Sequence, residues 1–187
     1  MSLLPLMHWL AEFPSSIALR ESLFVWPLVE STHVLTLAVF VGTAAMMDLR
    51  LLGVSFGGVP ASAFTSRLLP WTRASFALMT VTGLLLFYAT PVRNYQNLFF
   101  RVKVILLVAA GLNVWLFHSR IHRRIAEWDL ERVPPRAARV AAIVSLAAWA
   151  GVVVAGRMMA YNWFDCDLQP QSAFVNWAAG CVVPAAE

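Results

Sequence analysis

Glu30 and His33 lie three residues apart in the apolar stretch "LVESTHVLTL". Ionisable groups are costly in hydrocarbon, so each is expected to pair, to bind a ligand or to carry chemistry. A neutral imidazole is a good iron ligand, and a bundle of helices can enclose a haem. We therefore predict that His33 either ligates a haem b or stays a neutral histidine hydrogen-bonded to Glu30, Ser31 or Thr32. A second iron ligand could come from a methionine, and the candidates are Met79, Met158 and Met159.

Arg157 is the predicted partner of Glu30. With the outer membrane surface placed near Phe24, the helical rise puts both Glu30 and Arg157 at a depth of roughly 9 Å. A charge in hydrocarbon is stabilised by an opposite charge at the same level. We expect an ion pair between these two residues that joins the first and last membrane spans.

The other titratable residues give weaker signals. His118 and His122 share a helical face but lie among arginines, which favours a solvated basic helix end over a metal site. His118 also lies roughly 18 Å from His33 along the bundle, too far for the two to share one iron. Cys166 and Cys181 are the only cysteines, and outside the cytoplasm they form either a disulfide or two free thiols.

The composition is that of an integral membrane protein. Of the 187 residues 60% are hydrophobic and 13% charged, and the mean hydropathy is +0.70. A soluble domain of this size could not bury so much apolar surface. The net charge of +4 reflects arginines between apolar runs, so we expect no nucleic-acid partner.

Four stretches are long and apolar enough to span a bilayer. They cover about residues 24–47, 68–90, 99–117 and 139–161, and a short interfacial helix is expected at 4–12. We predict an all-α integral-membrane four-helix bundle over residues 1–163, followed by a tail at 164–187.

The arginines give the predicted orientation, because basic loops stay in the cytoplasm. The third loop is the most basic, with Arg120, Arg123, Arg124, Arg132, Arg136 and Arg139. Arg93, Arg101 and Lys103, counted with the second loop, weaken this contrast without reversing it. We expect a multi-pass protein of the bacterial inner membrane with both termini outside.

Small and polar residues inside the spans are expected to hold the helices together. The fourth span has Ala147, Gly151 and Ala155 at four-residue spacing, which could face either the bundle or a partner subunit. Asn113 is predicted to hydrogen-bond across helices. Asp48 is expected to form an ion pair, with Arg139 as one candidate.

Several segments together resemble a known family. These are "RESLFVWPLVESTHVL", "DLRLLG", "LLPWTRASFALMTVTGLLLF", "FRVKVILLVAAGLNVWLFH" and "AGRMMAY". The chain resembles, over most of residues 20–162, small bacterial four-helix membrane proteins classed as a domain of unknown function. The His33 to Gly42 spacing is also similar to the first spans of haem-binding membrane protoporphyrinogen oxidases and copper-resistance-type membrane proteins. That likeness implies haem at His33.

The favoured function is an accessory or anchor subunit of a membrane complex, with a redox complex as its context and haem b at His33. Its expected partners are the lipid bilayer and other membrane subunits or a second copy. The spacing of serine, histidine and acid assembles no catalytic triad, so an enzymatic role is not favoured. The alternatives are a stand-alone or quinone-linked membrane oxidoreductase and a small-molecule transporter, although broken helix pairs typical of transporters are absent.

Overall fold

The computed structural model describes residues 2–161, 163–167 and 169–181. Its four long helices are α3 (Val25–Leu52), α4 (Ala61–Ala89), α6 (Leu98–Leu116) and α8 (Arg136–Met158). Within the described ranges the chain is helical and contains no strand, which confirms the predicted all-α fold. Four helical segments are long and apolar enough to cross a membrane, and we therefore describe the chain as a multi-pass membrane protein.

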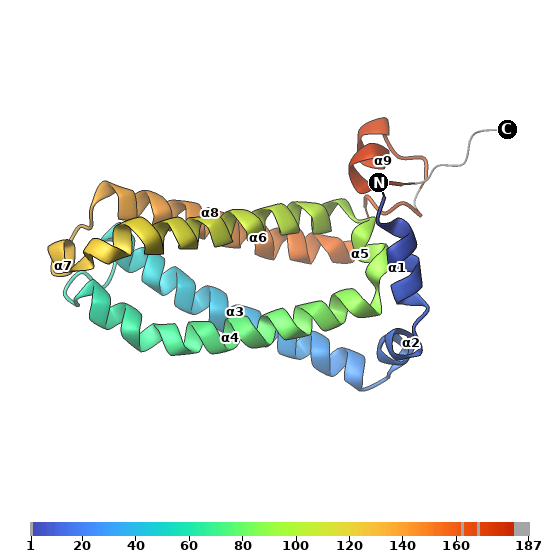
Figure 1. The fold of residues 1–187 in the computed structure, drawn as a ribbon, viewed down its shortest axis with the longest axis horizontal. Helices are drawn as coiled ribbons and strands as arrows, with labels where there is room; N and C mark the ends of the chain where they lie inside the picture. The colour runs from blue at the N-terminus through green and yellow to red at the C-terminus, as the bar shows by residue number, and fades with distance from the viewer. Residues whose placement is uncertain (1, 162, 168, 182–187) are drawn as a thin grey trace.

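The bundle consists of two hairpins, α3 with α4 and α6 with α8, and α3 also packs on α8 (Figure 1). Its core lies at mid-length, where Phe40 meets Trp149 edge-on at a centroid distance of 4.5 Å. Alanine and glycine let the helices approach: a Cβ on Gly151 would lie 2.8 Å from the Leu106 side chain. Van der Waals packing of this kind replaces the hydrophobic driving force that lipid cannot supply.

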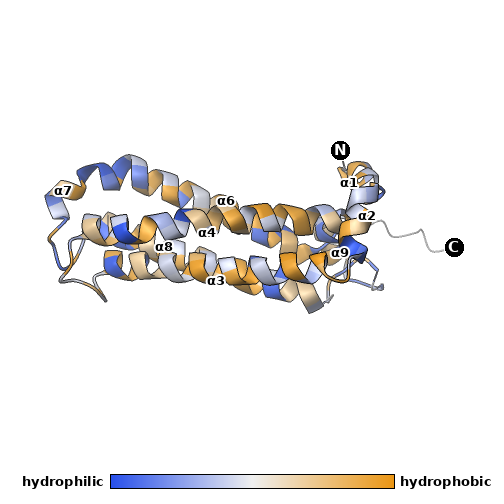
Figure 2. Cartoon of the chain, turned by 90° about the horizontal axis from the view of Figure 1, so that it is seen from below, coloured by the Kyte–Doolittle hydropathy of each residue, from blue (hydrophilic) through white to orange (hydrophobic). Residues whose placement is uncertain are grey.

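Short elements close the bundle at each end. The cap end carries α1 (Leu4–Ala11), α2 (Pro14–Glu21), α5 (Pro91–Tyr95) and α9 (Ala173–Ala179), together with a 3₁₀ turn at Met159–Tyr161 (Figure 1). At the arginine end α6 continues through a π turn (Phe117–Ile121) and a 3₁₀ turn (His122–Arg124) into α7 (Ile125–Trp128). Hydrophobic residues dominate the middle of the long helices, and hydrophilic residues are frequent near α7 (Figure 2).

Helix bounds differ from the prediction mainly at the arginine end. Helix α4 begins at Ala61, seven residues before the predicted start at 68, and α3 runs on to Leu52. The first turns of α4 contain polar residues such as Ser62 and Arg67, so the apolar stretch that predicted this span began later than the helix does. A helix can continue into the interfacial region where its end is capped. Gly53 follows the last residue of α3 as its C-cap, with a φ of +74° that suits glycine.

The segment after the last span is folded. Ser172 accepts a hydrogen bond from the Val175 amide and so caps α9, and Gly180 ends it with a φ of +70°. Val175 and Ala179 are buried, and α9 packs against α6. Residues 182–187 of the predicted tail lie outside the described residues.

Candidate functional site

His33 is held by α4 rather than by its own helix. Its Nδ1 lies 3.1 Å from the Met79 carbonyl oxygen and 3.0 Å from the Thr82 hydroxyl. Gly83 makes this approach possible, because a Cβ there would lie 3.1 Å from His33 Cε1. The partners predicted for a neutral His33, which were Glu30, Ser31 and Thr32, are therefore replaced by groups of the facing helix.

These contacts fix the tautomer of His33. The Met79 carbonyl can only accept, and the Thr82 hydroxyl is within donating distance of the Leu78 carbonyl at 2.9 Å and the Met79 carbonyl at 3.1 Å. Nδ1 must therefore carry the proton and donate it. Nε2 keeps its lone pair, and no other described residue is hydrogen-bonded to it.

Lys103 brings a cation to the same level. It is the only lysine of the chain, lies inside α6, and interacts electrostatically with His33. A Cβ on Gly156 of α8 would lie 3.6 Å from its Nζ. The ion pairs found among the described residues join Arg20 to Glu21 and Arg93 to Asp165, so neither neutralises Lys103.

We call His33, Thr82, Gly83, Lys103 and Gly156 the His33 centre, to which each of the four long helices contributes. The centre offers a lone pair at Nε2 and an ammonium group, inside a span. Such a pair can ligate a metal through nitrogen, accept a proton, and hold an anionic or carbonyl oxygen. Within the described ranges no three His, Cys, Asp or Glu residues cluster as a metal site.

The Glu30–Arg157 ion pair is not present among the described residues. Both side chains are exposed, and Arg157 instead lies over the Tyr161 ring at 5.2 Å, with its Nη2 3.3 Å from the hydroxyl. Helical rise gave the two residues a common depth but not a common direction. Toward the cap end α3 diverges from α8 (Figure 1), and Glu30 lies on an exposed face of α3.

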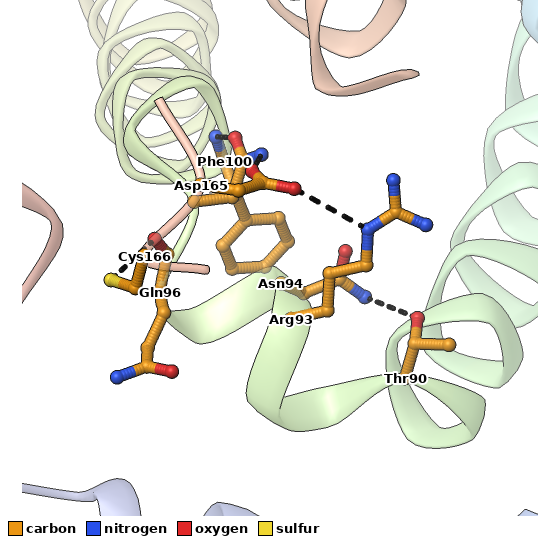
Figure 3. Close-up of polar contacts among 8 residues, drawn as sticks. Thr90, Arg93, Asn94, Gln96, Phe100, Asp165 and Cys166 are labelled. Carbon is orange, nitrogen blue, oxygen red and sulfur yellow. Dashed lines mark hydrogen bonds and ion pairs between the residues drawn. The ribbon is translucent and has the colours of Figure 1, made fainter. Parts of the chain in front are cut away.

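The cap end has its own polar cluster (Figure 3). Asp165 accepts a hydrogen bond of 2.7 Å from Asn97 and lies 3.7 Å from Arg93 Nε. The Cys166 and Cys181 sulfurs are joined in a disulfide, with a bond length of 2.08 Å. A cavity of about 380 Å³ beside this cluster is lined by charges of both signs: Arg20, Arg93, Asp165 and Asp167.

Arg50 organises the arginine end. It is 1% exposed and donates to the carbonyls of Val59, Asp129 and Glu131 over 2.9, 3.4 and 3.2 Å. It thereby ties the α3–α4 loop to the segment that follows α7.

The other polar residues predicted inside the spans have mixed outcomes. Asn113 donates to the Ala141 carbonyl over 2.9 Å, which confirms its cross-helix bond. Asp48 is buried and hydrogen-bonds Ser145, and no Asp48–Arg139 ion pair forms among the described residues. The rings of His118 and His122 stack at 4.6 Å.

Sequence reasoning missed Lys103, Thr82 and Gly83. Lys103 was counted as a loop charge, yet it lies five residues inside α6, which begins at Leu98. The sequence offered one hint that Lys103 is special: it is a single lysine in a chain whose other cationic residues are thirteen arginines. Thr82 and Gly83 carried none, because threonine and glycine in a span ordinarily indicate only helix packing.

Comparison with known proteins gives a family without a function. No curated protein and no solved structure matches the chain. The model of a family of unknown function, DUF6644, matches residues 24–162, which include the whole His33 centre. Since this match covers more than half of the 187 residues, the chain belongs to the DUF6644 family.

Proposed function

We propose that this protein is an accessory subunit of a redox complex in the bacterial inner membrane and that His33 ligates a haem b. The observation that carries the proposal is the Nδ1 hydrogen bond from His33 to the Met79 carbonyl. A histidine that ligates a metal typically donates its other ring nitrogen to such an acceptor, which fixes the ring and raises the basicity of the ligand nitrogen.

The residues of the centre fit one side of a haem. His33 offers Nε2 to the iron, Thr82 and Met79 orient the ring, and Gly83 lets α3 and α4 come close. Lys103 supplies a cation for a propionate carboxylate and has no carboxylate partner in the described chain. Bound there, a haem would supply one-electron transfer.

A partner subunit or a second copy would complete the complex. His118 and His122 lie in the turns that follow α6 at the arginine end, so they could not reach an iron bound by His33. A second ligand to the iron would therefore come from a methionine of this chain or from a neighbouring subunit. The basic arginine end would face the cytoplasm and both termini the outside, as the arginine distribution favours.

A quinone-linked oxidoreductase is the second candidate, and Lys103 favours it. A quinol hydroxyl could donate to His33 Nε2 while the Lys103 ammonium donates to the other ring oxygen. Both candidate functions involve electron transfer, but only a bound haem would give the purified protein a Soret band.

Absorption spectroscopy of the gently extracted protein, expressed with ample haem, tests the proposal. We expect a Soret band that shifts on reduction, that is abolished by His33→Ala and that is retained in His118→Ala. Lys103→Met should retain the band and shift its midpoint potential, since the lysine would act on a propionate. A colourless wild-type protein would overturn the haem proposal. Retention of a ubiquinone analogue by that colourless protein, lost in both His33→Ala and Lys103→Met, would support the quinone reading.

A further inference from the structure

A groove at the arginine end lies between the end of α3 and the first turns of α8. Its volume is about 310 Å³, and its lining combines four apolar side chains with two arginines and no acid: Leu52, Val54, Arg136, Arg139, Val140 and Ile143. The groove is independent of the His33 centre, because its residues lie at the opposite end of α3 and α8.

The groove starts at a membrane boundary and runs inward. Leu52 is the last residue of α3 and Arg136 the first of α8, so both mark the point where a span ends. Ile143 lies seven residues further along α8, or roughly 10 Å by helical rise. Arg136 therefore stands at the headgroup level, Arg139 about one turn further in, and Ile143 at the level of the upper acyl chain.

Arg139 has an unsatisfied donor at this place. Its Nε is buried from solvent and has no hydrogen-bond partner. A buried donor without a partner costs free energy that a bound acceptor would recover. Arg136, by contrast, is exposed and can turn toward the same acceptor.

We infer that this groove binds one anionic phospholipid. Its phosphate would accept hydrogen bonds from Arg136 and Arg139, whose planar guanidinium groups match phosphate oxygens. An acyl chain would lie along Val140 and Ile143, which are 58% and 56% exposed and continue the lipid-facing surface of α8. A free phosphate would leave that apolar part of the groove uncovered, and basic pockets at span ends are known to take anionic headgroups.

Native mass spectrometry of the full-length protein in detergent tests this inference. Dioleoyl phosphatidylglycerol and dioleoyl phosphatidylcholine, which share their acyl chains, are titrated separately, and glycerol 3-phosphate serves as the headgroup without a chain. We expect one phosphatidylglycerol to bind roughly tenfold more tightly than phosphatidylcholine. Glycerol phosphate should compete weakly. Equal binding of both lipids, or competition by glycerol phosphate as strong as by the lipid, would overturn the inference.

A matched pair of variants locates the site. Arg136→Gln with Arg139→Gln should remove the preference for phosphatidylglycerol. Arg120→Gln with Arg124→Gln removes the same charge from exposed residues of the same end that do not line the groove, and it should keep the preference. If both double variants lost the preference for phosphatidylglycerol equally, the lipid would be binding to the basic surface in general and not to this groove. If the first double variant does not fold, the exposed Arg136→Gln alone should still weaken binding severalfold, and an unchanged affinity would count against the groove.

Discussion

The two ends of the bundle are closed by different means. At the arginine end a buried side chain, Arg50, joins two loops through three backbone carbonyls, and Asp129 adds two hydrogen bonds to Ser62 at the start of α4. At the cap end the closure is spread over a disulfide, an α9 helix packed on α6, and Asp165 with its two partners. The closure of the arginine end therefore depends strongly on one buried side chain, whereas the closure of the cap end is spread over separate elements.

This difference bears on where the His33 centre lies. Arg50, Asp48 and the Asn113–Ala141 bond hold the half of the bundle toward the arginine end. The His33 centre lies in the other half, where α3 contacts α4 but diverges from α8 (Figure 1).

Loss of Arg50 is the largest effect we expect. Arg50→Met supplies an unbranched apolar side chain but leaves three backbone carbonyls without their charged donor. Hydrogen bonds to charged groups contribute about 1.5–3 kcal/mol each. We expect a loss of about 3 kcal/mol or more, which is less than the sum of the three bonds because removing the guanidinium also removes its desolvation cost. Thermal unfolding in detergent, followed by tryptophan fluorescence, measures it.

Arg67→Met is the matched control for that experiment. Arg67 is exposed near the same end, on the first turns of α4, and removing it should change stability by less than about 0.5 kcal/mol. Equal melting temperatures for the two variants would show that Arg50 does not hold this end together.

Breaking the disulfide should act on the cap end alone. Cys166 and Cys181 are 15 residues apart, and a loop of that length contributes about 3 kcal/mol by chain entropy. Cys166→Ser with Cys181→Ser should therefore expose the segment around α9 to protease while the membrane spans keep their melting temperature. Unreduced wild-type protein should resist alkylation at both cysteines, and labelling of both would instead show the two free thiols.

Gly83→Ala should change stability by less than the substitutions above, so its effect has to be measured against a control variant, Gly111→Ala. The new methyl would press on His33 Cε1, whereas a Cβ on Gly111 would meet nothing within 4 Å. Both substitutions gain the same helix propensity, about 1 kcal/mol, so their difference isolates the contact with His33. We expect Gly83→Ala to be less stable than Gly111→Ala by about 1 kcal/mol. The difference should disappear when His33→Ala is added to both, and its persistence would place the clash elsewhere.

The sequence predicted the spans well and the contacts unevenly. Apolar length located all four long helices, because the bilayer sets that length for any sequence. It identified His33 and Asn113 as polar residues needing partners, and for Asn113 it also gave the kind of bond. It could not choose the face of α3 that Glu30 occupies, because depth follows from residue number but direction depends on how the helices cross.

The cap end was the least predictable region. Asp165 and Arg93 are distant in sequence and meet only because α5 and the segment after α8 fold over the same end. Arg50 was visible as a charge at a span end, but its three carbonyl partners carry no sequence signal at all. Backbone acceptors are present at every residue, so only the fold determines which of them a buried arginine meets.

Asp129 should give the smallest effect, and it depends on pH. Helix α4 begins after Pro60, whose side chain cannot cap it, and Asp129 from the other loop accepts from the Ser62 amide and hydroxyl, each over 2.7 Å. These hydrogen bonds hold the pKa of the Asp129 carboxyl below its ordinary value of 3.8. A lowered folded-state pKa means that the charged form adds stability above that value and that this stability is lost as the pH falls through the folded pKa. Asp129→Asn keeps an oxygen for the Ser62 amide but removes the charge, and because the group is well hydrated we expect a loss below about 1 kcal/mol. The difference in melting temperature between wild type and Asp129→Asn should therefore be constant from about pH 8 to pH 5 and shrink below about pH 4. A difference that stays the same down to pH 3 would assign the effect to side-chain shape rather than to the carboxylate charge.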